Sequence, residues 1–316
     1  MYIGRFAPAR LRSTFVAVIR DTGLTRTDAK SDFTRERRRR ALAKIASRLR
    51  SEPSDVSHML PFEEVLAALG RHSQRDLGIQ TIPLESIVGS VDRDRREFDR
   101  DFRPLTPGVR CRWEDIAAAR RRGVELPPID VYRIGDLHFV QDGHHRVSVA
   151  RAQGDSHIDA HVVEIKTKIG ANRELRLRDL PLKRHERVFF ERIPLPPQAR
   201  ARIQLSDEWR YARLGDLIEA WGYRASHDRG RLLSREEMAE SWFKEEYCPV
   251  VEALAEARAG GGGTETERYL RIAMLRYLLL HTHDWSDDVV DRLLGEARRP
   301  GIEEDTMVHQ LLKEMG

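Results

Sequence analysis

Residues 130–165, near the middle of the chain, restrict its possible folds more than any other stretch. Two short apolar runs, 131–134 and 138–140, flank Gly135-Asp136, a pair typical of a tight turn between antiparallel strands. The sequence DGHHR follows at 142–146, and apolar residues at helical spacing then lead to Gly154, a typical helix end. Another strand is predicted at 158–165. The pattern therefore predicts a hairpin, a strand-to-helix corner at DGHHR, a short helix and a further strand.

The corner has residues suited to binding an anion. The first N–H groups of a helix are unpaired, and the helix dipole places partial positive charge there. Gly143 lets a phosphate approach the backbone, Arg146 can donate a forked pair of hydrogen bonds, and His144 and His145 can exchange protons near neutral pH. Asp142 could cap the helix, hold a metal ion beside a phosphate, or accept a proton. The alternative is structural, with a capping Asp, a turn Gly and two surface histidines; so many functional groups in one corner favour a site.

The segment 126–154, followed by 158–165, resembles the core of the ParB N-terminal, or ParB/sulfiredoxin, superfamily. A proline-preceded strand, a hairpin, a corner of this type and a helix ending in glycine recur in that family, and 82–102 is similar to its opening strand and first helical segment. The resemblance implies a small mixed sheet with helices and a nucleotide-phosphate site at Gly143, His144, His145 and Arg146. Members include CTP-dependent DNA clamps, sulfinic-acid reductases, free-serine kinases and ParB-like nucleases, so the resemblance implies a site more securely than a reaction.

The chain also departs from the DNA-partition members of that family. His144 and His145 stand where those members have an acidic residue and an arginine, and the DGHHR form is closer to the kinase-like members. The implied cofactor is therefore a nucleotide, CTP, ATP or ADP, together with Mg²⁺. No ENxxR-like segment and no clear helix-turn-helix follow the core, and Cys111 and Cys248 lie far from the corner, unlike a reductase cysteine.

Two enzymatic interpretations remain open, a nucleotide hydrolase and a phosphotransferase. The predicted catalytic residues are Asp142, His144 and His145. Nearby acids that could serve as a general base are Glu85, Glu97 and Asp99, although a surface salt bridge is the competing interpretation of each. On the phosphate-site interpretation, Gly143→Val and Arg146→Ala variants should stay folded and lose nucleotide binding.

Residues 35–50, RERRRRALAKIASRLR, hold eight Arg or Lys residues and one acid, in a chain of net charge +4. Apolar residues recur there at helical spacing: Ala41, Leu42, Ile45, Ala46 and Leu49. The pattern predicts a basic amphipathic helix. One interpretation is contact with a DNA or RNA backbone through Arg37, Arg38, Arg39, Arg40 and Lys44. The other is a solvated helix that docks on the protein by its Leu/Ile face.

The remaining pattern predicts the organisation of the chain. We expect an α+β protein with a basic helical segment over 1–78, a ParB/sulfiredoxin-like domain over 79–168, a linker over 169–205 and an all-α domain over 206–316. No run of eighteen apolar residues and no signal-peptide core occurs, which favours a cytoplasmic protein without a membrane partner. Two distant cysteines give no disulfide framework, and we assign no metal site in the protein itself.

The C-terminal region, especially residues 233–254 and 262–280, resembles a helical domain of unknown function sometimes found beside ParB-like cores. Its aromatic residues are expected in the core or in homodimer contacts: Trp242, Phe243, Tyr247, Tyr269 and Tyr277. His281, His283 and Asp284 have metal-ligand chemistry, but histidines are common at helix ends, which is the favoured interpretation. Walker A, HExxH, GxSxG and CxxC signatures are absent.

Three functions therefore remain. The leading one is a ParB-like nucleotide-binding protein that acts with nucleic acid; the others are a small-molecule phosphotransferase that resembles free-serine kinases and a non-catalytic ligand sensor.

Overall fold

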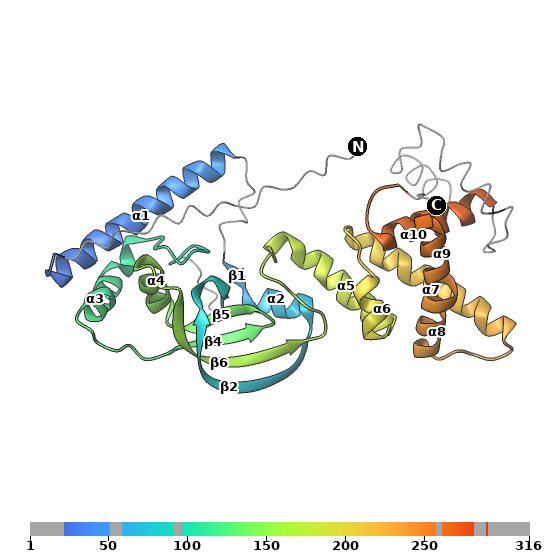
Figure 1. Cartoon of the computed structure of the whole chain (residues 1–316), viewed down its shortest axis with the longest axis horizontal. Helices are drawn as coiled ribbons and strands as arrows, with labels where there is room; N and C mark the ends of the chain where they lie inside the picture. Colours follow the sequence, from blue (N-terminus) through green and yellow to red (C-terminus); the bar gives the residue numbers. More distant parts are fainter. Residues whose placement is uncertain (1–21, 51–58, 92–96, 257–260, 281–288, 290–316) are drawn as a thin grey trace. The chain divides into compact units, whose positions relative to one another are not determined.

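A computed structural model of the chain describes residues 22–50, 59–91, 97–256, 261–280 and 289 (Figure 1). The described residues up to Pro181 form one compact unit, and those from Leu182 on form a second. The predicted linker, 169–205, contains two helices, α5 (Leu180–Arg192) and α6 (Pro197–Arg202), and the predicted domain limits at 78, 168 and 205 stay predictions. Within the described ranges, no helix combines the length and the apolar character needed to cross a membrane.

The first unit is built on a six-stranded mixed sheet with the strand order β1-β3-β5-β4-β6-β2. The strands are β1 (Leu60–Pro61), β2 (Arg71–Pro83), β3 (Ile87–Ser90), β4 (Ile129–Ile134), β5 (Leu137–Asp142) and β6 (His157–Thr167). Parallel pairing joins β1 to β3, β3 to β5 and β4 to β6, whereas β4 with β5 and β2 with β6 are antiparallel. This mixed sheet with its helices confirms the predicted α+β class.

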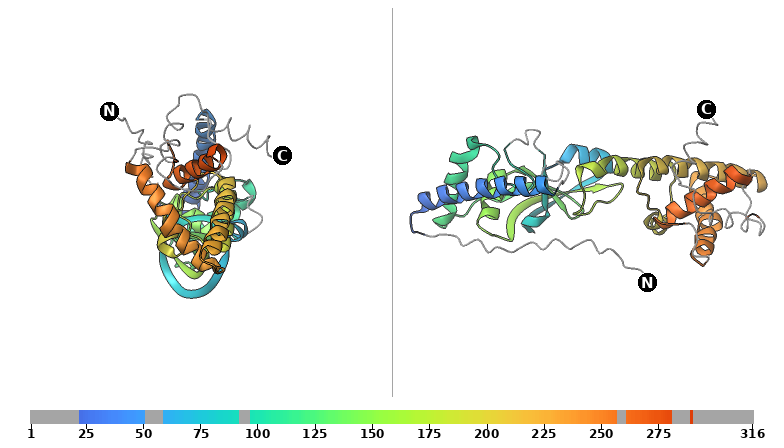
Figure 2. Two further views of the ribbon diagram at one scale, coloured as in Figure 1. Left: turned by 90° about the vertical axis from the view of Figure 1, so that its right-hand side faces the viewer. Right: turned by 90° about the horizontal axis from the view of Figure 1, so that it is seen from above.

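Helices cover both faces of the sheet. The core over one face comes from α1 (Thr25–Leu49), α3 (Arg110–Arg121) and α4 (His144–Ala152), and Figures 1 and 2 show α1 alongside α3. Trp113 of α3 is fully buried there, where it meets the Phe33 ring at 5.5 Å and donates from Nε1 to Ser148 Oγ of α4 at 2.8 Å. On the other face, α2 (Phe62–Leu69) stacks the Phe62 ring on Tyr132 at 4.8 Å. Short 3₁₀ turns lie at Leu84–Ser86, Pro107–Val109 and Leu177–Asp179.

The predicted hairpin and corner are confirmed. Ile134 pairs with Leu137 across Gly135-Asp136, β5 runs into α4 at DGHHR, and Gly154, at φ +83°, follows the end of α4 before β6 begins. Residues 76–78 hold Asp76 and Gly78, which are typical of turns, yet they belong to β2. Pairing with β6 continues there across a bulge between Asp76 and Ile79, and Gly78 N–H donates to Asp76 Oδ1 at 2.8 Å.

The second unit is helical in its described part, as predicted. Its further helices are α7 (Glu208–Asp228), α8 (Arg235–Trp242), a π-helical turn (Phe243–Tyr247), α9 (Cys248–Glu256) and α10 (Glu265–Leu280). Ser234 and Glu237 form a capping box at the start of α8, where each side chain accepts from the backbone N–H of the other. The predicted all-α domain beyond residue 280, apart from residue 289, lies outside the described residues, and so do His281, His283 and Asp284.

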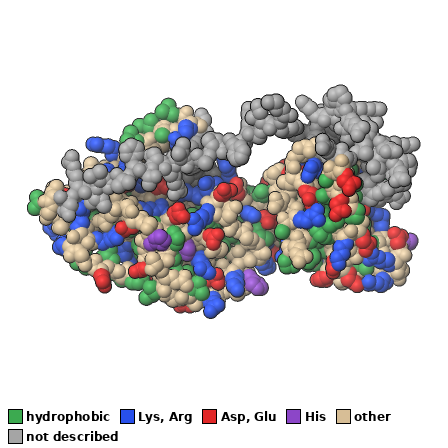
Figure 3. All heavy atoms as spheres, viewed as in Figure 1, with side chains coloured by type: hydrophobic (Ala, Val, Ile, Leu, Met, Phe, Trp, Pro, Cys, Tyr) green, Lys and Arg blue, Asp and Glu red, His purple; other side chains and the backbone are tan. Residues whose placement is uncertain are grey.

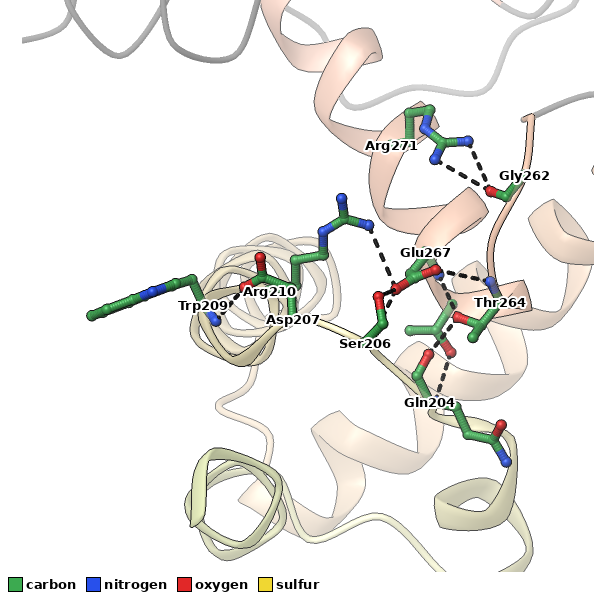
Figure 4. A network of polar contacts seen from close by, with 10 residues as sticks. Gln204, Ser206, Asp207, Trp209, Arg210, Gly262, Thr264, Glu267 and Arg271 are labelled. Carbon is green, nitrogen blue, oxygen red and sulfur yellow. Dashed lines mark hydrogen bonds and ion pairs between the residues drawn. The ribbon is translucent and has the colours of Figure 1, made fainter. Parts of the chain in front are cut away.

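A buried carboxylate joins two segments of this second unit (Figure 4). Glu267 accepts from the backbone N–H groups of Ser206 and Thr264, at 2.9 Å each, so it holds the chain before α7 against the start of α10. Trp242, Tyr247 and Tyr269 are buried around the same helices, which confirms their predicted core role. Tyr277 is 44% exposed and is not a core residue, because α10 turns it outward.

Candidate functional site

Gly143 shapes the corner between β5 and α4. Its φ of +100° is a conformation that favours glycine, and a Cβ at this position would lie 2.4 Å from Ile129 Cγ2 on β4. Its carbonyl accepts the first hydrogen bond of α4, from Val147 N–H at 3.0 Å, and no side chain caps the helix. The expectation that Gly143→Val stays folded is therefore wrong, because the new side chain would collide with β4.

Arg146 fastens the corner to the chain that enters β4. Its Nη1 donates to the carbonyl oxygens of Pro127 and Pro128, at 2.6 Å each, and its Nη2 donates to Asp142 Oδ2 at 2.5 Å. Pro127 and Pro128 precede β4, whose strand pairing begins at Ile129, so Arg146 supplies donors to carbonyls that lie outside the ladder. The predicted phosphate ligand therefore already has a structural role, and a phosphate would have to share its guanidinium with Asp142, whose side chain is 62% exposed.

His144 meets a residue that sequence reasoning missed. Its Nε2 lies 2.7 Å from the hydroxyl of Ser90, and its ring stacks on Phe102 with the ring centroids 6.1 Å apart. Ser90 is buried at the end of β3, which runs parallel to β5. Parallel neighbours bring their carboxyl ends to one edge, so the serine that ends β3 reaches the corner, and only the strand pairing reveals this.

His145 is enclosed by the loop that precedes α3. Its ring meets Phe98 edge to face at 5.1 Å, and its Nδ1 is buried without a hydrogen-bond partner among the described residues. Burial, then the charge of Arg112, then His144 lower the pKa of His145 to about 4. The imidazole is therefore neutral at neutral pH, and its 4.0 Å approach to Glu97 Oε2 is not an ion pair under those conditions.

The three acids predicted as general bases have different surroundings. Glu97 lies at the corner beside His145, whereas Glu85 pairs with Arg173 at 2.7 Å. Asp99 accepts the backbone N–H groups of residues 101 and 103, and burial raises its pKa, so it shapes its own loop. That loop holds Phe102 at a strained φ of +57° against His144. Only Glu97 is placed to act with the histidines.

The corner suits a metal ion only together with phosphates. No group of three or more His, Cys, Asp or Glu side chains is arranged to hold a metal in the described part of the chain. Mg²⁺ commonly takes one or two carboxylates and fills its other positions with phosphate oxygens and water. Asp142, which is largely exposed at the end of β5, fits that limited role.

The basic helix docks by a different face from the one predicted. The residues that α1 buries lie in its first half: Asp28, Ala29, Asp32, Phe33 and Glu36. On that buried side, Phe33 packs against Trp113 of α3, and Arg121 of α3 pairs with Asp32 at 2.5 Å. The predicted apolar docking face lies on the other side of α1 and is exposed. The expectation of docking through Leu42, Ile45 and Leu49 is therefore wrong.

The five predicted nucleic-acid residues are not equivalent. Arg39 pairs with Glu36 at 2.8 Å, and Arg40 donates to the carbonyl oxygen of Leu105 at 3.3 Å. Arg38 and Lys44 are exposed and Arg37 is half-buried. On the face shown in Figure 3, Lys and Arg side chains are interspersed with Asp and Glu side chains over the coloured residues. The basic run of α1 is thus a local feature.

In comparisons with known proteins, no family model and no curated protein matches the chain. A solved structure described as "Structure of the C2221 form of Pnob8-like ParB-N domain" matches over 77% of this chain and 98% of that one. The identity is 13% and the TM-score is 0.21. A TM-score this low does not establish a shared fold, so the ParB-like assignment rests on the sequence pattern around DGHHR.

Proposed function

We propose that this protein binds the phosphates of a nucleotide at the α4 corner and acts with nucleic acid, as ParB-like proteins do. The observation that carries the proposal is the first turn of α4, which begins at Gly143 without a side-chain cap. Uncapped helix starts attract anions, and His144, His145 and Arg146 occupy the three positions that follow.

Charge near the corner supports the same ligand. His145 is neutral at neutral pH, so Arg146 and Arg112 supply the positive charge, the latter being close enough to depress the pKa of His145. Arg112 is exposed at the start of α3, where its guanidinium can meet a phosphate. Mg²⁺ at Asp142 would add a further cation beside the phosphates.

The test measures thermal stabilisation and calorimetric affinity with CTP, ATP, ADP and GTP, each with and without Mg²⁺. A bound nucleotide should raise the melting temperature, because it binds only the folded state. Arg112→Glu should weaken binding about tenfold or more, since it reverses a charge near the phosphates. Arg122→Glu, exposed at the other end of α3, is the matched control and should bind normally. No stabilisation by any nucleotide would refute the proposal.

The second candidate function is phosphoryl transfer to a small hydroxyl compound. It is favoured by the carboxylate of Glu97 beside His145, because a base that accepts the acceptor's proton is what such a transfer needs. Incubation with ATP or ADP, Mg²⁺ and a pool of hydroxyl amino acids should then give a phosphorylated product. Glu97→Gln and Asp142→Asn should each lose it, and Glu97→Gln should still bind nucleotide. Bound nucleotide without product would remove the phosphotransferase and leave the leading proposal and the non-catalytic sensor.

A further inference from the structure

The second half of α1 carries an apolar row that faces away from its own unit. Leu42, Ile45 and Leu49 are 60%, 55% and 82% exposed. Their spacing of three and four residues places them in one row about 10 Å long. At 100° per residue, this row lies on roughly the opposite side of the helix from Ala29 and Phe33, which pack toward α3. We call Leu42, Ile45 and Leu49 the α1 seam.

Positive charge surrounds the α1 seam. Residues 37–50 contain seven Arg or Lys residues and no Asp or Glu. By helical geometry, Arg48 borders one side of the seam and Arg39 borders the other, while Arg38 lies in line with it. A partner must therefore cover three apolar side chains and also offer negative charge on both flanks.

Three other occupants fit these requirements less well. A nucleic-acid backbone would meet the cations but leave the apolar side chains exposed. A lipid surface would have to accept Arg38 in the middle of the inserted row, and residues 37–50 provide no aromatic anchor. A second copy of α1 would bring two helices of like charge together, which is unfavourable in a paired seam. An acidic helix satisfies both requirements.

We propose that the α1 seam docks an amphipathic helix of a partner protein whose apolar residues repeat at three- and four-residue spacing and are flanked by Asp and Glu. The spacing of the seam matches the a and d positions of a heptad, so side chains of the partner can interlock with it. The flanking carboxylates would pair with Arg48 on one side and, on the other, with Arg39, which also pairs with Glu36. This proposal is independent of nucleotide binding at the α4 corner.

The experiment titrates the full chain into a labelled synthetic three-heptad helix with Leu and Ile at a and d and Glu at e and g, and follows fluorescence anisotropy. The acidic helix should bind, and binding should weaken as salt is raised. The combined variant Leu42→Ser, Ile45→Ser, Leu49→Ser should keep its unfolding midpoint, because these side chains are exposed, and bind about tenfold or more weakly. Leu232→Ser, at a leucine that is 87% exposed in the second unit, is the control and should bind normally.

Several results would overturn the proposal. One is no binding of the acidic helix, and another is equal binding by the triple variant or by a lysine-flanked version of the same peptide. Duplex DNA or anionic phosphatidylserine vesicles that bind only when the three apolar residues are present would assign the seam to those partners instead. A concentration-dependent dimer that the triple variant abolishes would assign it to a second copy of the chain.

Discussion

The α4 corner and the second half of α1 are both rich in charged or polar residues, yet the fold uses them in opposite ways. In the corner, Arg146 holds two proline carbonyls and Asp142, and Gly143 fits closely against Ile129. In α1, Lys44 is exposed in the half of the helix that follows the buried residues, which end at Glu36. An arginine becomes part of the framework where nearby carbonyls lack other donors, and it stays available to partners where the helix projects. Changes in the corner should therefore affect folding first, and changes in α1 should affect binding first.

The largest expected effect is that of Gly143→Ala. We expect a loss of about 2–4 kcal/mol in the free energy of unfolding, because the new Cβ adds left-handed strain and a collision with Ile129. Gly154→Ala is the matched control, since its φ is +83° but nothing lies within 4 Å of the added carbon. It should lose only about 1 kcal/mol, from strain alone. Urea denaturation measures both, and equal losses would show that β4 yields to the added carbon.

Local patterns predicted the hairpin, the corner and α4 because glycines mark their ends. Gly135, Gly143 and Gly154 each have positive φ at a turn that separates regular elements. Non-local pairing was out of reach: nothing around Ser90 indicates that β3 lies beside β5 and brings its hydroxyl to His144. The same limit explains β2, where Asp76 and Gly78, residue types typical of turns, lie within a strand because β6 pairs with it.

The docking face of α1 could not be predicted for a related reason. Acidic residues are usually exposed, yet α1 buries Asp28, Asp32 and Glu36 and exposes Leu42 and Ile45, which one of the two interpretations had placed on its docking face. Burial of acids becomes favourable when a cation from another element pairs with them, as Arg121 of α3 does with Asp32. A sequence read one helix at a time does not contain that partner.

An intermediate effect is expected from pH at the corner. The folded protein holds the pKa of His145 near 4, and the unfolded chain has the ordinary value near 6.5, so the unfolded chain binds more protons between these values. The stability from this group is full above about pH 6.5 and is lost as pH falls toward 4, by up to about 3 kcal/mol. His145→Gln should therefore flatten the dependence of unfolding free energy on pH in that window.

Two other histidines help to interpret the pH dependence of the unfolding free energy. Burial lowers the pKa of His138 to about 4 as well, so His145→Gln should keep part of the pH dependence. His227 is 84% exposed, and His227→Gln should leave the dependence as it is. An unchanged slope in His145→Gln would mean that the loop carrying Phe98 opens and lets water reach the ring. That outcome would place the corner among the loosely held parts of the protein.

The smallest effect on folding, and the clearest on binding, is expected in α1. Arg38→Ser with Lys44→Ser should change the free energy of unfolding by no more than about 0.5 kcal/mol, because both side chains are exposed. If these cations contact duplex DNA, each lost phosphate contact should reduce the slope of log affinity against log salt by about 0.9, or roughly 2 for the pair. Filter binding or anisotropy at several salt concentrations measures the slope.

The pair Arg39→Ser with Arg40→Ser provides the comparison within the same helix. Arg39 already pairs with Glu36, and Arg40 already donates to the carbonyl of Leu105. Their loss should therefore lower the free energy of unfolding slightly and change the salt slope less than the loss of Arg38 and Lys44 does. The triple variant of the α1 seam should leave the slope unchanged, because phosphates do not need apolar contacts. Equal slopes in the parent and in Arg38→Ser with Lys44→Ser, or no DNA binding at low salt, would remove nucleic acid as a partner of α1. An acidic protein helix would then be the one remaining proposed ligand of this surface.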